Sequence, residues 1–155
     1  MKKIFYTIIV FILIVGVTGC GKDEGKITIT CTSKEDKLGS METQNVTTYH
    51  FDDNQYVTDY SIVTTQKFED KSTYDEYKKA QEETLESSTE DVTYDLKADD
   101  KKMTLVFTMT IKKIDINNAE TEEEKDSLKA SSILDRNESV GSTCKVKGIS
   151  KSKLK

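Results

Sequence analysis

The chain is poor in the residues on which several common kinds of functional site depend. Its 155 residues include no proline, no tryptophan and a single histidine, His50. One histidine excludes a histidine-rich metal centre, and Cys31, Cys144 and His50 together lack the fourth ligand and the close cysteine spacing of a zinc site. We therefore interpret His50 as a solvated or structural residue.

Motifs for phosphate binding and nucleophilic catalysis are also missing. The seven glycines are spread singly, which excludes a glycine-rich phosphate loop. No G-x-S-x-G elbow and no S-x-x-K arrangement occurs in a credible context. The acidic run at 120–126 lacks the ligand spacing and internal glycine of an EF-hand loop, and residues 52–54 are typical of an ordinary turn. The sequence predicts a non-enzyme with no catalytic residue, no cofactor and no metal.

Positive charge is scarce relative to negative charge. The formal net charge is −5, and it becomes −7 for residues 20–155, which hold 21 basic and 28 acidic residues. Nucleic acid is an unsuitable partner, because affinity for it comes from cations that neutralise phosphates. An anionic membrane surface repels the domain for the same reason. We interpret the acidic balance as an aid to solubility.

One long hydrophobic run is present, at the start of the chain. Two lysines precede an apolar run over 4–17, and the small residues Thr18 and Gly19 then lead to Cys20. A charged start, an apolar middle and a small-residue end are the parts of a secretory signal. A cysteine directly after them resembles a bacterial lipobox, in which the thiol receives a diacylglycerol and becomes the first residue.

The lipobox predicts a signal peptide over 1–19, a lipidated Cys20 with a short tether to residue 25, and attachment to the extracytoplasmic face of the cell membrane. Two acyl chains give stable anchoring. An uncleaved transmembrane helix is an alternative, but the run is about 14 residues long and spanning needs roughly 20. A plain signal peptide, with Cys20 as an ordinary thiol, is another.

Lipidation of Cys20 leaves Cys31 and Cys144 as the other two cysteines. In an exported protein such a pair is most simply a disulfide, although two buried thiols remain an alternative. Each cysteine falls on the apolar face of a predicted strand. A bond between them requires these strands to be neighbours, with Cα atoms about 5.5–6 Å apart.

Alternation of apolar and polar residues predicts most of the secondary structure. The fold class predicted is α+β, with an antiparallel sheet of five or six strands and one or two helices packed on one face. The sheet belongs to one domain over 26–147, followed by a basic tail at 148–155 without a packing signal. The expected strands are 26–32, 42–51, 56–68, 91–98, 103–111 and 142–147, the expected helices are 72–87 and 118–135, and 34–40 is a polar connection.

Several details of packing follow from the same patterns. Ser72 resembles the N-cap of the first helix. We expect this helix to pack on the apolar face formed by Ile62, Leu96, Leu105 and Phe107. A capping box from Thr121 to Glu124 should open the second helix, which is short or mobile because it has few packing residues. In the strand at 56–68, strict alternation places Tyr60 and Val57 on opposite faces.

Tyrosine is the remaining hint of a binding site. The chain has more tyrosines than a small core needs, and tyrosine is enriched where an apolar surface also meets water. Tyr49, Tyr56 and Tyr60 are the candidate residues for contact with a ligand or partner. The alternative is that these side chains cap the edge of a modest core.

With the lipobox around Cys20 and the order of elements from Ile27 to Val146, the chain resembles small bacterial lipoproteins of the YehR-like type. The resemblance implies a compact α+β envelope domain with no assigned catalytic residue. We expect a membrane-anchored, non-enzymatic binding or interaction module whose partner is an envelope protein or a small ligand. An envelope enzyme inhibitor, acting through the turn at 52–56, and a structural surface lipoprotein without a discrete site are the alternatives.

Overall fold

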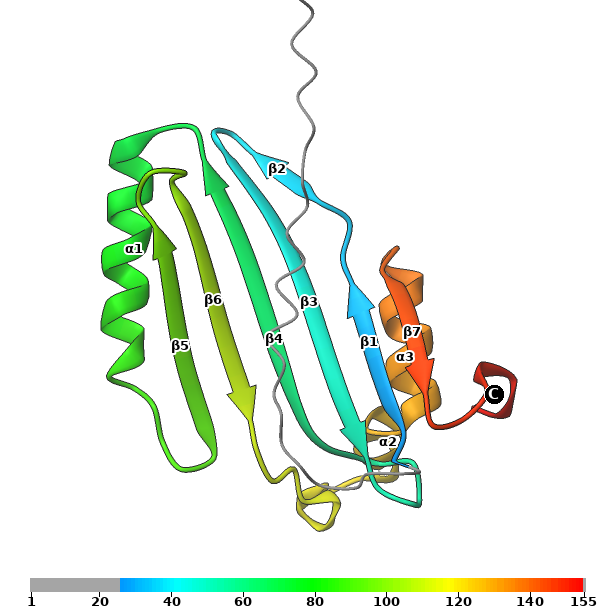
Figure 1. Ribbon diagram of the computed structural model, residues 1–155. Coiled ribbons are helices and arrows are strands. Elements are labelled where there is room, and N and C mark those ends of the chain that lie inside the picture. The colour runs from blue at the N-terminus through cyan, green and yellow to red at the C-terminus, as the bar shows by residue number, and fades with distance from the viewer. Residues whose placement is uncertain (1–25, 155) are drawn as a thin grey trace, which may run out of the picture.

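One open antiparallel sheet organises the molecule. The computed structural model describes residues 26–154. The sheet has seven strands in the order β5-β6-β4-β3-β1-β7, and β2 pairs with β3 beside this path (Figure 1). The predicted α+β class is confirmed, with one strand more than expected. The strands are β1 (Thr28–Thr32), β2 (Asp36–Leu38), β3 (Met41–Phe51), β4 (Val57–Phe68), β5 (Val92–Asp99), β6 (Thr104–Ile111) and β7 (Thr143–Lys147).

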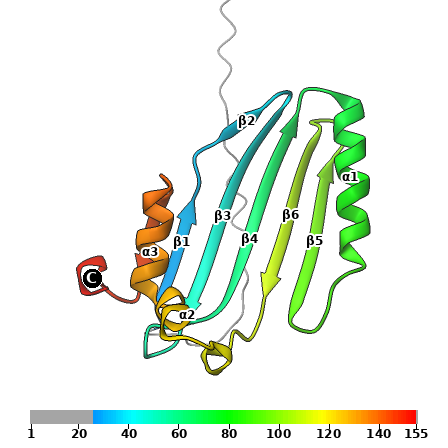
Figure 2. The same cartoon turned by 180° about the vertical axis from the view of Figure 1, so that it is seen from behind.

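Helices lie against one face of the sheet, at its two opposite edges. The α-helices are α1 (Lys71–Leu85), α2 (Glu122–Ser127) and α3 (Ala130–Ser139), and two short 3-10 helices are η1 (Ile116–Asn118) and η2 (Lys151–Lys153). Seen from behind, α1 stands over the β5 edge and α3 over the β1 and β7 edge, and the middle parts of β3, β4 and β6 run between them (Figure 2). Towards their ends, Phe68 of β4 and Leu105 of β6 are buried with Tyr74 of α1, and Phe51 of β3 is buried in the cluster that contains α3. The helices therefore frame the sheet and leave its middle open.

The start of α1 differs from the prediction. Asp70 is the N-cap, and its carboxylate accepts hydrogen bonds from the backbone N–H and the hydroxyl of Thr73, at 2.7 and 2.6 Å. Ser72 lies inside the helix. An aspartate is as good an N-cap as serine, so the helix extends back to the first residue that can satisfy its free N–H groups.

The second predicted helix is two helices. The capping box between Thr121 and Glu124 is present at the start of α2, but the helix stops at residue 127. There the chain bonds to the β3–β4 turn, where Val57 N–H donates to Leu128 O and Ala130 N–H donates to Gln55 O. This docking allows α3 to begin in a new direction. The expectation of a short helix is confirmed, since α2 has 6 residues and α3 has 10. The few packing residues of α3, Ala130, Ile133 and Leu134, are all buried.

Buried apolar side chains form two separate clusters. The first, which we call the α3 core, contains Ile27, Ile29, Cys31, Phe51, Val57, Ala130, Ile133, Leu134 and Leu154. The second, the α1 core, contains Phe68, Tyr74 and Leu105, flanked by Met41, Leu96 and Met103. Leu96 and Leu105 contact α1 as predicted. Ile62 and Phe107 lie outside both clusters and are half-buried, because α1 packs on β4 and β6 at Phe68 and Leu105 rather than at these two residues.

A bulge changes the faces at one end of the β3–β4 hairpin. His50 pairs with Asp59, whereas Phe51 pairs with Val57, so Thr58 has no opposite residue. An extra residue of this kind reverses the alternation that follows it. Val57 therefore joins Phe51 in the α3 core, and its predicted position on the opposite face to Tyr60 is wrong.

The segment after β7 packs against the domain. Gly148 has a φ of +87°, and a Cβ there would lie 2.5 Å from the carbonyl oxygen of Lys26, so only glycine fits this close approach. The turn brings Leu154 into the α3 core, where it is 4 % exposed. The expectation of a tail without packing is therefore wrong for Leu154.

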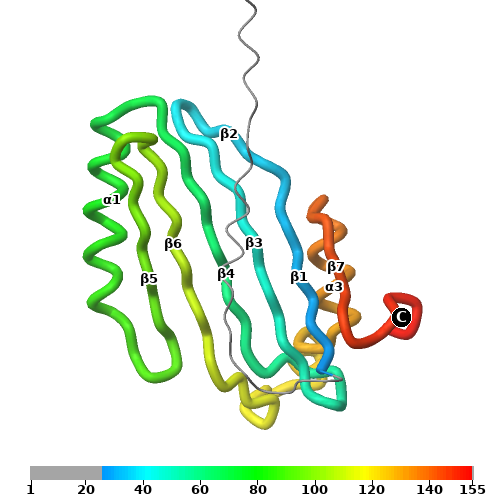
Figure 3. Tube along the Cα trace, in the orientation of Figure 1, coloured from blue at the N-terminus to red at the C-terminus, as the bar shows by residue number. Residues whose placement is uncertain are grey.

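The first and last strands in chain order, β1 and β7, are neighbours in the sheet. In the chain trace β1 and β7 run side by side (Figure 3), and Cys31 lies directly opposite Cys144. Their sulfur atoms are 2.04 Å apart, the distance of a disulfide bond. The Cα atoms are 4.1 Å apart, closer than predicted, because directly opposed residues of antiparallel strands approach each other closely. The predicted neighbourhood of the two strands is confirmed.

Candidate binding face

The middle of the helix-bearing face carries nine half-buried side chains in three rows. The register of β3, β4 and β6 aligns Tyr49 with Tyr60 and Ile111, Thr47 with Ile62 and Met109, and Asn45 with Thr64 and Phe107. We call these nine residues the central strip. All nine are half-buried and none is ionisable in the physiological range, although 33 % of the whole chain is charged. The central strip is therefore an uncharged, partly apolar surface between α1 and α3.

Aromatic pairs occupy the central strip. The rings of Tyr49 and Tyr60 have centroids 5.6 Å apart, and Phe107 stacks on Tyr94 of β5 with centroids 5.7 Å apart. Burial raises the pKa of Tyr60, and the neighbouring Tyr49 raises it further. Both effects favour the neutral phenol. Two of the three tyrosines predicted as candidate contacts thus lie together on one surface.

Tyr56, the third candidate tyrosine, lies elsewhere. It forms an isolated backbone bridge with Lys129, whose ammonium nitrogen is 5.8 Å from the centroid of the Tyr56 ring. The adjoining turn is held from within, since the Asp52 carboxylate accepts hydrogen bonds from the N–H groups of Asn54 and Tyr56. The turn is also fixed to the start of α3, because the Ala130 N–H donates to Gln55 O.

Amide and hydroxyl groups surround the aromatic rings. The Thr64 hydroxyl donates to Asn45 Oδ1 at 2.8 Å. From α3, the side chain of Asn137 donates to the hydroxyl of Tyr49 at 3.4 Å, and from α1 the side chain of Gln81 donates to the buried Gln66 at 2.6 Å. Sequence reasoning missed these residues, because amides on strands and helices form no recognisable spacing. The alternation of β3 was nevertheless a usable signal, since it places Asn45 and Thr47 on the face of Tyr49.

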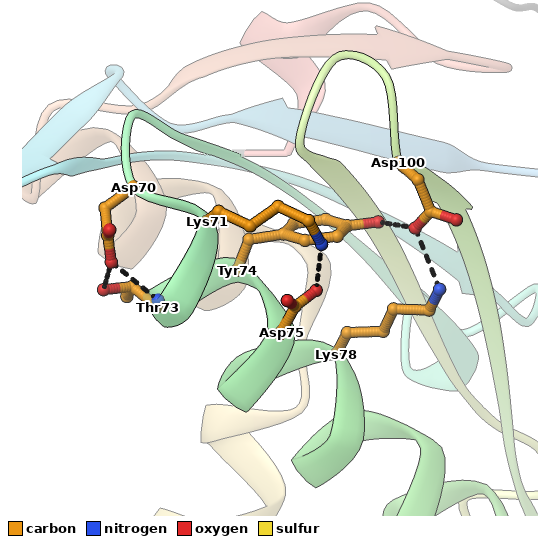
Figure 4. Close-up of polar contacts among 7 residues, drawn as sticks. All are labelled: Asp70, Lys71, Thr73, Tyr74, Asp75, Lys78 and Asp100. Carbon is orange, nitrogen blue, oxygen red and sulfur yellow. Dashed lines mark hydrogen bonds and ion pairs between the residues drawn. The ribbon is translucent and has the colours of Figure 1, made fainter.

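A second polar cluster fixes α1 to the β5–β6 turn. The Tyr74 hydroxyl donates to Asp100 Oδ1 at 2.5 Å, and Lys78 Nζ donates to the same oxygen at 2.9 Å (Figure 4). Burial of Tyr74 and its bond to Asp100 raise the pKa of the phenol. The bonds from Tyr74 and Lys78 hold the pKa of Asp100 below its usual value. Every group here has its partner within the cluster, so its role is to hold α1 in place.

His50 lines a hollow of about 480 Å³ at the end of β3 and β4, together with Lys26, Asp53, Asp59 and other residues. His50 Nδ1 lies 2.5 Å from Asp59 Oδ1, and the Thr58 hydroxyl donates to the other carboxylate oxygen at 3.0 Å. The histidine and aspartate side chains are 47 % and 39 % exposed. This exposed pair lies on the other face of the sheet from the central strip and contains none of the candidate tyrosines.

Within residues 26–154 no group of three or more histidine, cysteine, aspartate or glutamate side chains is placed to hold a metal ion. No helix of this described part is long and apolar enough to cross a membrane. Cys20, the predicted lipidation site, lies outside the described residues. Searches among family models, curated proteins and solved structures gave no match.

Proposed function

We propose that this protein is a lipid-anchored, non-enzymatic binding module on the extracytoplasmic face of a bacterial cell membrane. The residues before Cys20 support export and lipidation. The pairing of Cys31 with Cys144 supports an oxidising compartment, since disulfides persist there and are rare in the cytosol.

The observation that carries the binding proposal is the central strip. Half-buried aromatic and aliphatic side chains such as Tyr60, Ile62 and Met109 form one continuous surface in the register of three neighbouring strands. Contiguous apolar surface of this kind is typical of interaction sites, and tyrosine and methionine are enriched in such surfaces.

The predicted tether limits where a partner is met. Residues 21–25 reach roughly 20 Å when extended, so the domain stays close to the bilayer. The proposed partner is therefore a component of the envelope near the membrane surface.

Retention of envelope material tests the proposal. Full-length chain is immobilised and incubated with envelope extract, alongside Ile62→Lys and Val63→Lys. These neighbouring half-buried residues of β4 lie on opposite faces, so both variants add the same charge at matched positions. We expect Ile62→Lys to lose the retained material and Val63→Lys to keep it. Equal retention by both variants would show that the central strip is not the binding surface.

The anchoring part has its own readout. Metabolic labelling with a fatty acid should tag the chain, and Cys20→Ser should abolish the label. A label that survives this substitution contradicts the lipobox interpretation.

A further inference from the structure

The groups that surround the central strip define its ligand more closely. We infer that the central strip, with the facing sides of α1 and α3, binds an uncharged oligosaccharide. This inference rests on the proposed function and names the class of ligand at the same site.

Amide groups are the first reason. An amide side chain carries both donors and an acceptor, and so matches a sugar hydroxyl, which also donates and accepts. Asn45 lies within the central strip, Asn137 reaches it from α3, and Gln81 reaches the neighbouring Gln66 from α1. Three separate elements, β3, α3 and α1, thus bring amide side chains to the same side of the sheet.

Unused hydrogen-bonding capacity is the second reason. Within the described part of the chain, the Asn45 oxygen accepts from Thr64 and no protein group pairs with its amide nitrogen or with the Thr47 hydroxyl. An acyl chain or an apolar peptide side chain laid over Asn45 and Thr47 would bury these groups unpaired, which is costly. A hydroxylated ligand satisfies them.

Aromatic rings are the third reason. A sugar ring has an apolar C–H face, and tyrosine offers a flat apolar ring with a polar tip. Tyr49, Tyr60 and Phe107 provide such rings beside the amides, and Tyr77 of α1, which is 37 % exposed, contacts Phe68 at the border of the site.

The charge and size of the central strip further restrict the class of ligand. The central strip holds no cation to pair with a phosphate or carboxylate, and the acidic domain repels polyanions. An anionic glycan is therefore a poor fit. Three strands by five residues measure about 10 Å by 14 Å, an area that suits a short oligosaccharide better than a single sugar.

Titration calorimetry with soluble oligomers of N-acetylglucosamine and of glucose tests the inference. The full chain is held in a zwitterionic, sugar-free detergent. We expect saturable binding of at least one oligomer. Tyr60→Ala should weaken it at least about tenfold because it removes the aromatic contact, and Tyr60→Phe should preserve most of it. Asn45→Ala should weaken it as well.

Ser61→Ala is the matched control, because Ser61 is the next residue of β4 and points to the other face. It should leave binding unchanged, and thermal unfolding confirms that all variants are folded. Absence of binding to both oligomers, or equal weakening by Ser61→Ala, overturns the inference. So does concentration-dependent self-association that is abolished by Tyr60→Ala, because the central strip would then bind a second copy.

The outcomes separate this inference from the proposed function. Retention of an envelope protein through Ile62 without oligosaccharide binding overturns the sugar ligand and leaves a binding module. If the chain binds an oligosaccharide but takes up no fatty-acid label at Cys20, the result supports the sugar ligand and contradicts the lipid anchor.

Discussion

The two ends of the sheet are stabilised in different ways. At the α3 end, nine buried residues form one apolar core, and the Cys31–Cys144 pair joins the outermost strand to its neighbour. At the α1 end the buried residues are Phe68, Tyr74, Leu105 and the polar Gln66, and the helix is held in addition by polar contacts of Tyr74 and Gln81. The comparison teaches that each helix stabilises its own edge, so the middle of the sheet can remain open without a cover.

Among the changes that test this difference between the two ends, removal of the disulfide should have the largest effect on stability. The two cysteines are separated by 113 positions in the sequence, and replacing both by alanine should lower the free energy of unfolding by about 4–5 kcal/mol in the loop-entropy model. Urea unfolding of the wild-type chain and the double variant measures the difference. A reductant should destabilise the wild-type chain and leave the variant unchanged. An equal response of the two chains would show that the bond does not form.

Matched leucines compare the two cores directly. Leu134 in the α3 core and Leu105 in the α1 core are both fully buried. Leu134→Ala should cost about 2–5 kcal/mol. Leu105→Ala should cost less, because Met41 and Met103 border its cluster and flexible methionines can fill part of the cavity. Chemical denaturation gives both values, and a larger loss for Leu105→Ala would reverse the ranking of the two ends.

A smaller effect is expected at Tyr74. Tyr74→Phe removes the hydrogen bond to Asp100 and should cost about 1 kcal/mol at neutral pH. Since the folded-state pKa of Tyr74 is raised, its contribution is complete below the unfolded pKa of about 10 and declines above it. Wild-type protein should therefore lose stability above about pH 10, and Tyr74→Phe should lose less over that range. Identical alkaline profiles would exclude the phenol as the cause.

Local patterns in the sequence were sufficient for the regular parts of the fold. Alternation predicted β6 and the β3–β4 hairpin because both faces of these strands differ in polarity. It failed at Val57 and at the break between α2 and α3, because both depend on hydrogen bonds between segments distant in sequence, such as Gln55 O with Ala130 N–H. No local pattern contains that information.

In the candidate site, too, some residues were predictable from the sequence and others were not. Tyr49 and Tyr60 were found from residue type, and their direct pairing follows from the hairpin register. Asn137 could not be found, because it reaches Tyr49 from α3, 88 residues further along the chain. Tyr56 was included from composition alone, and the bulge at Thr58 places it outside the central strip.

Site-specific photo-crosslinking in living cells tests the central claim most directly. A photoreactive amino acid is placed at position 62, in the central strip, or at position 63, on the other face of the same strand. The account predicts discrete adducts with an envelope component from position 62 and none from position 63. Adducts from position 63 alone, or from neither position in chains shown to be folded, would contradict the assignment of the central strip as the binding face.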